Sequence, residues 1–130
     1  MNRRRVKITG IGPVTPAGIG REAFWNGILE PVSRVRPYTK LGEENGAFVA
    51  AHISGFDAAK FVPDRTMLPR GASRQSLFAV VGAMLALQDA GISHDEFRRS
   101  NAAIVTGSSL MDFGGIVASI DATTRKGIRA

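Results

Sequence analysis

Residues 5–20 read R-V-K-I-T-G-I-G-P-V-T-P-A-G-I-G, and this stretch decides the class of fold. Its first part, residues 6–9, is apolar and β-branched at alternate positions, which favours a strand. Pro13 and Pro16 have no amide proton to donate to a neighbouring strand, so the strand is expected to stop near Gly12.

A helix is predicted directly after this loop, over residues 21–29. Glu22 falls in its first turn, where the helix dipole favours a negative charge, and Pro31 ends it. Its larger apolar residues recur at spacings of three and four and give one apolar face; they are Phe24, Trp25, Ile28 and Leu29. A strand, a loop rich in glycine and proline, and a helix form the opening of an α/β domain.

The strongest helix prediction covers residues 73–90, with Ser73 as N-cap and Gly91 as the left-handed residue that stops it. Its large side chains are apolar almost all the way round, and alanines and glycines between them leave room for close approach. A helix with this pattern is expected to be buried.

Loops, strands and shorter helices are predicted for the rest of the chain. We expect a loop over 33–46, a strand over 47–53, a short helix capped by Asp57, a polar connection over 92–100, a strand over 101–106 and a helix over 116–124. The order β-α-β-α-α-β-α predicts a mostly parallel sheet with helices on its faces.

Composition narrows the class of protein. The chain has 130 residues, 44% of them hydrophobic, which is enough for one globular domain. Its net charge of +6 favours an acidic partner. The few aromatic residues are not interleaved with the basic ones, which argues against nucleic acid. The sequence predicts neither a signal peptide nor a membrane span, so a cytoplasmic location is expected.

The sequence contains no complete catalytic or ligand-binding motif. The glycine loop lacks the third glycine of a dinucleotide site, and Pro13 removes an amide that a phosphate would need. Met111 stands where a nucleophile elbow around Ser109 needs glycine. There is no cysteine, and His52 and His94, the only histidines, have no carboxylate or serine at a suitable spacing. The sequence therefore predicts no catalytic residue, no metal site and no cofactor.

Five motifs, in order, resemble the N-terminal part of the β-ketoacyl-acyl carrier protein synthases, which are condensing enzymes of the thiolase-like superfamily. They are V-K-I-T-G-I-G-P-V-T-P-A-G-I-G followed by F-W, then R-P at 36–37, G-F-D at 55–57, A-L-Q-D-A-G-I at 86–92 and I-V-T-G-S-S at 104–109. The resemblance implies a thiolase-like α/β fold, with a partial mixed or parallel sheet, flanking helices and a long buried helix at about 73–90.

The resemblance implies that residues 1–130 are the N-terminal portion of such a domain. The family's nucleophilic cysteine and its two catalytic histidines belong to later motifs, and no residue here matches them. The parent protein would be an acyltransferase that condenses an acyl chain with malonyl-ACP, in fatty acid or polyketide synthesis, as a homodimer or heterodimer.

The resemblance also implies two sites within this chain. Arg65, Arg70 and Arg74 fall on the stretch where the family docks its acidic acyl carrier protein, although some neighbouring positions that are usually basic are not basic here. Leu110 falls at the position that lines the acyl pocket near the dimer interface.

Two other functions stay open at this point. Ser109, Met111 and Asp112 stand where many members have glycine, which leaves a non-catalytic partner subunit, like a chain-length factor, as one alternative. The other is a small stand-alone basic binding domain.

Overall fold

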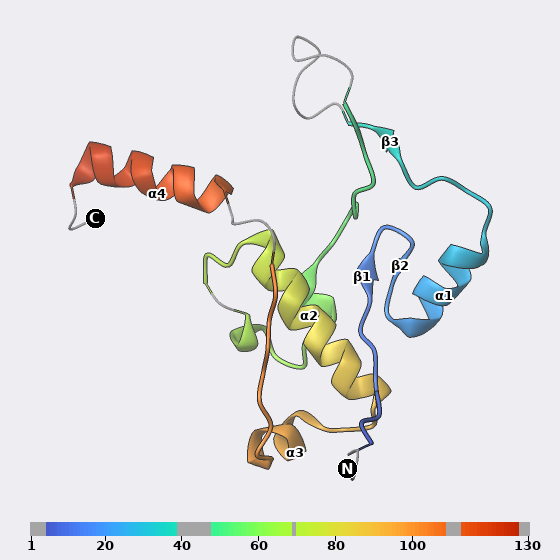
Figure 1. Cartoon of the computed structure of the whole chain (residues 1–130). Coiled ribbons are helices and arrows are strands. Elements are labelled where there is room, and N and C mark those ends of the chain that lie inside the picture. Colours follow the sequence, from blue (N-terminus) through green and yellow to red (C-terminus); the bar gives the residue numbers. More distant parts are fainter. Residues whose placement is uncertain (1–4, 39–47, 69, 109–112, 128–130) are drawn as a thin grey trace.

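The computed structural model describes residues 5–38, 48–68, 70–108 and 113–127 (Figure 1). The α-helices are α1 (Arg21–Leu29), α2 (Arg74–Asp89), α3 (His94–Arg99) and α4 (Phe113–Lys126), and two single-turn 3-10 helices are η2 (Ala58–Lys60) and η3 (Arg65–Met67). The strands are β1 (Val14–Thr15), β2 (Gly18–Ile19), β3 (Arg36–Pro37) and β4 (Val49–Ala50). None of the described helices is long and apolar enough to span a membrane.

The glycine- and proline-rich loop forms a tight hairpin that packs on α1. Strands β1 and β2 pair antiparallel, with Val14 opposite Ile19. The hydroxyl of Thr15 accepts hydrogen bonds from the amides of Ala17 and Gly18 and so closes the turn. A Cβ added to Gly27 of α1 would lie 1.8 Å from the carbonyl oxygen of Ala17, so the hairpin can approach the helix because glycine stands there.

Helix α1 confirms the sequence prediction at both ends. It begins at Arg21 with Glu22 in the first turn, and it gives way to extended backbone at Glu30, just before Pro31. The proline cannot continue the helix because its ring clashes with the preceding turn.

Helix α2 has the predicted caps and accepts the N-terminal segment directly on its backbone. The hydroxyl of Ser73 accepts a hydrogen bond from the amide of Ser76, and Gly91 has a φ of 69°. A Cβ added to Gly12 would lie 1.9 Å from the carbonyl oxygen of Gly82, and one added to Gly10 would lie 2.2 Å from that of Ala86. The glycines of the opening stretch therefore serve close packing of an extended chain against a helix.

Asp89, at the end of α2, links three parts of the chain. Its carboxylate accepts a hydrogen bond from the amide of Ile11 at 3.0 Å and forms an ion pair with Arg21 at 2.6 Å. Local spacing does not predict this hydrogen bond, because 78 residues separate Asp89 from Ile11 in the sequence.

The prediction that this helix is buried is not confirmed. Val81 is its one buried side chain, and most of the others are half-buried. The side that faces residues 10–14 and η2 is covered, but the described part of the chain supplies too few layers to cover the rest.

The predicted parallel sheet is wrong for the described residues. The two ladders are both antiparallel, β1 with β2 and β3 with β4, and β3 lies where a loop was expected. Residues 6–9 and 101–106, predicted as strands, are extended but join no ladder with another described residue (Figure 1). A strand is completed by the hydrogen bonds of its neighbour, which local β-propensity cannot supply.

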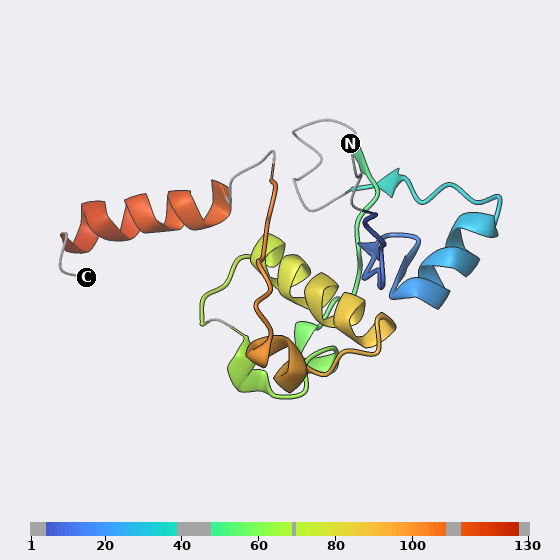
Figure 2. The ribbon, with the colours of Figure 1, turned by 60° about the horizontal axis from the view of Figure 1, so that its bottom comes forward.

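Three shorter elements complete the fold. Asp57 caps η2 as predicted, by accepting a hydrogen bond from the amide of Ala59. The expected polar connection over 92–100 contains α3, whose N-terminus is closed by a capping box between Ser93 and Glu96. Helix α4 extends the predicted 116–124 helix at both ends and stands apart from the other helices in both views (Figures 1 and 2).

Candidate functional site

The three arginines singled out by the sequence analysis lie around the start of α2. Arg65 is on η3, Arg70 precedes the helix and Arg74 is its first residue; all three are exposed. Leu110, the fourth predicted site residue, lies outside the described residues.

A cluster of three aromatic rings packs next to Arg74 at the start of α2. The ring of Phe56 packs edge-on against that of Phe78 at 4.8 Å between centroids and is stacked with Phe61 at 6.3 Å. Phe56 comes from the extended segment after β4, Phe61 follows η2 and Phe78 belongs to α2. The cluster thus packs the residues on either side of η2 against α2, next to Arg74.

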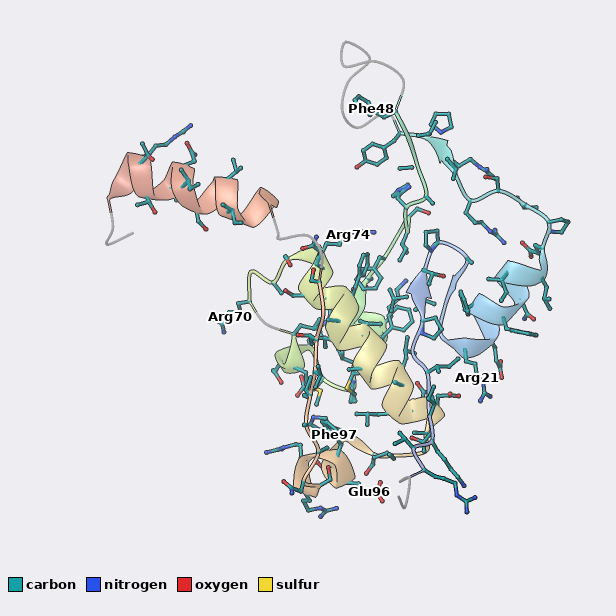
Figure 3. The ribbon with its side chains drawn as sticks, in the orientation of Figure 1. Arg21, Phe48, Arg70, Arg74, Glu96 and Phe97 are labelled. Atoms are coloured by element: carbon teal, nitrogen blue, oxygen red, sulfur yellow. The ribbon has the colours of Figure 1, made fainter. Side chains whose placement is uncertain are left out.

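The three arginines differ in their surroundings. The guanidinium of Arg74 lies over the rings of both Phe56 and Phe78 and donates a hydrogen bond to the carbonyl of Ile53. Arg70 points away from the ribbon (Figure 3). Arg65 is exposed and follows Asp64 in the sequence.

Asp64 is held in its charged form. Its carboxylate accepts a hydrogen bond of 2.8 Å from the amide of Thr66, and the hydrogen bonds from Thr66 lower the pKa of Asp64. Arg65 and Arg70 are both exposed, and no ion pair or hydrogen bond joins either side chain to another described residue.

The two histidines do not form a site. His52 was expected in a strand, but it lies beyond β4 and is exposed, with its ring edge-on to Tyr38 at 5.7 Å. His94 starts α3, and its Nδ1 lies 4.0 Å from the carboxylate of Asp95. Within the ranges that the structure describes, no three potential metal-binding side chains lie together.

The structure also adds features that sequence reasoning missed. The pairing of Arg74 with Phe78 could have been found from its i, i+4 spacing on a predicted helix. The contact with Ile53 could not, because 21 residues separate the partners. An apolar hollow of about 550 Å³ lies beside α1, with Trp25 on its wall, and the sequence did not predict it.

Comparison with known proteins decides the family. The family model described as "Beta-ketoacyl synthase, N-terminal domain" matches residues 3–129, almost the whole chain. The chain belongs to the β-ketoacyl synthase family. This family has a thiolase-like α/β fold, which agrees with the combination of helices and small sheets in this chain.

Individual synthases support the assignment. The chain is 36% identical over 88 residues to a putative polyketide β-ketoacyl synthase 2 from Streptomyces coelicolor, covering 67% of this chain and 20% of that protein. It is 28% identical over 130 residues to 3-oxoacyl-[acyl-carrier-protein] synthase 2 from Coxiella burnetii, and the match covers 99% of this chain and 31% of that protein. The protein of the same name from Synechocystis is 27% identical over 111 residues, and the match covers 85% of this chain and 26% of that protein.

The chain therefore spans between a fifth and a third of the length of these relatives. No solved structure matched it.

Proposed function

We propose that the protein carrying this chain is a β-ketoacyl-ACP synthase, which extends an acyl chain by decarboxylative condensation with malonyl-ACP. The observation that carries the proposal is the family match over residues 3–129. Residues 1–130 would form the N-terminal portion of its thiolase-like domain. The curated relatives named above include synthases of fatty acid and polyketide type, so either pathway fits.

In this reaction the acyl group is transferred to a cysteine thiol of the enzyme, and malonyl-ACP loses carbon dioxide. The resulting carbanion attacks the thioester, which releases the free thiol and forms 3-oxoacyl-ACP. The cysteine and the histidines that the family uses have no counterpart in this sequence, which contains no cysteine. This chain would supply scaffold, part of the acyl pocket and part of the docking surface, and it needs no cofactor for these roles.

We assign the docking of the acidic carrier protein to the basic region before and at the start of α2. Arg65 and Arg70 are exposed there, and the chain has a net charge of +6, which favours an acidic partner. Arg74 belongs to the same region. Leu110 is assigned to the acyl pocket on the resemblance alone.

In the complete protein, helix α2 would be the long buried helix of the fold. Its large apolar residues extend beyond the face that is covered here. We also propose that the protein works in the cytoplasm as a homodimer or heterodimer of synthase subunits.

A second candidate is a non-catalytic partner subunit of the same fold. It is favoured by Ser109, Met111 and Asp112, which replace glycines common in the family and lie outside the described residues. A stand-alone basic binding domain is the third candidate, and the family match argues against it.

The test is to incubate the purified full-length protein with acyl-ACP and malonyl-ACP and to measure 3-oxoacyl-ACP by mass spectrometry. We expect condensation that stops when the nucleophilic cysteine encoded downstream of this segment is replaced by alanine. A coding region with another residue at that position, and no condensation without a second synthase subunit, would establish the partner subunit instead.

A further inference from the structure

Arg74 is engaged within the protein on three sides. Its guanidinium carbon lies 5.6 Å from the centroid of the Phe56 ring and 5.1 Å from that of Phe78. It also donates a hydrogen bond to the carbonyl oxygen of Ile53. These contacts connect the first turn of α2, where Figure 3 labels Arg74, to residues 53–56, which follow β4.

The position of Arg74 on the helix makes these contacts necessary. It is the first residue of α2, whose first turn contains no acidic side chain. The positive end of the helix dipole disfavours a cation at this place. Two aromatic faces and a carbonyl oxygen compensate, because a planar and weakly hydrated guanidinium can stack on rings while it donates hydrogen bonds.

Arg70 has the opposite character. It is exposed, and its side chain points away from the body of the protein (Figure 3). No ion pair or hydrogen bond joins its side chain to another described residue. Gly71, with a φ of 69°, and the Ser73 cap set the path of the backbone between Arg70 and α2.

We propose that Arg74 is a positioning residue of the docking surface and that Arg70 is the cation that meets the acidic carrier protein. Arg74 fixes the start of α2 on the aromatic cluster, and so fixes the direction in which Arg70 projects. This division of roles rests on the proposed function, since it assumes that a carrier protein docks here.

The experiment measures the dissociation constant of the full-length protein for purified acyl carrier protein at several salt concentrations. R70A should weaken binding about tenfold and flatten the salt dependence, because it removes a charge that contacts the partner. R74M should weaken binding about threefold and flatten the salt dependence less than R70A, because it misplaces Arg70 without removing its charge.

R74K separates charge from shape, since lysine keeps the positive charge but lacks the planar group that stacks on the rings. We expect R74K to resemble R74M. F78L removes a ring face and keeps Arg74, so it should weaken binding in the same way. F78L keeps the test available if a change at Arg74 prevents folding, which circular dichroism would reveal.

The double variant R70A/R74M provides the decisive comparison. If Arg74 acts through Arg70, the double variant binds no more weakly than R70A alone. Wild-type binding by R74K, or losses that multiply in the double variant, would show that Arg74 contacts the carrier directly and would overturn the inference. Unchanged binding and salt dependence in R70A would overturn the docking proposal itself.

Discussion

At the scale of single residues, glycines and one carboxylate hold the opening stretch in place. Gly10 and Gly12 let the extended chain lie directly on the backbone of α2, where even a methyl group would overlap a carbonyl oxygen. Asp89 then fixes this segment by accepting the amide proton of Ile11. A loop that resembles a phosphate site in its glycine content thus has a packing role.

The substitution Gly12→Ala should destabilise the protein by about 1–3 kcal/mol, because its Cβ would lie 1.9 Å from the carbonyl oxygen of Gly82. Gly107→Ala is the matched control, since no atom lies within 4 Å of its added Cβ. The control should leave stability unchanged or raise it by up to about 1 kcal/mol. Urea unfolding of both variants measures this difference, and equal stabilities would contradict the packing role.

At the scale of elements, the residues that cap or stop a helix predicted the structure better than the apolar pattern within the elements. The caps at Ser73 and Asp57 and the stop at Gly91 were predicted and are present. Helix α3 was missed because only its Ser93–Glu96 capping box marks it, in a stretch with little apolar periodicity.

The capping box of α3 makes a pH-dependent contribution that can be measured. The hydroxyl and amide of Ser93 donate hydrogen bonds of 2.5 and 2.8 Å to the carboxylate of Glu96, and these lower the pKa of Glu96 below its ordinary value. A carboxylate with a lowered folded-state pKa stabilises the folded state above the unfolded pKa. Helix α3 should therefore weaken as the pH falls below about 4.5 and through the lowered folded value.

Replacing Ser93 by alanine should raise the pKa of Glu96 toward its ordinary value, because the hydroxyl donor is lost. An NMR titration of side-chain carboxyl groups measures the shift. Asp64 is the internal control, because its pKa is lowered by Thr66 in another part of the chain and should not respond. A Glu96 pKa that is the same in both proteins would refute the capping-box explanation.

At the scale of the whole molecule, the main feature is apolar surface on extended segments without strand partners. Val6 and Ile8 are 92% and 87% exposed, and Ile104 and Val105 are 74% and 93% exposed. Soluble monomers rarely leave long extended segments of this kind uncovered, because the free backbone and side chains pair with other chains.

The 130-residue chain on its own should therefore bind a dye that is fluorescent on apolar surfaces, and it should self-associate. The double substitution Ile8→Thr and Val105→Thr should reduce both effects. Val32→Thr, at a valine that is 50% exposed outside these segments, is the control and should not. Light scattering measures association, and a monomer without dye binding would instead support the stand-alone domain.

The sequence by itself determined the family, the two main helices with their caps, and the absence of a cysteine nucleophile from this chain. The helices and their ends can be predicted because caps, stop residues and apolar spacing act within a few residues of each other. The family can be identified because its motifs occur in order along the chain. The basic region before α2 was found in the same way. The docking roles of Arg65, Arg70 and Arg74 and the pocket role of Leu110 remain predictions.

The tertiary structure alone decided how Arg74 is held, what Asp89 joins and which strands pair. Each depends on partners distant in the sequence, such as the carbonyl of Ile53 for Arg74 and the amide of Ile11 for Asp89. The strand predictions for 6–9 and 101–106 failed for the same reason. Their residues favour extended backbone, but a strand in a sheet also requires a neighbour to accept and donate its hydrogen bonds.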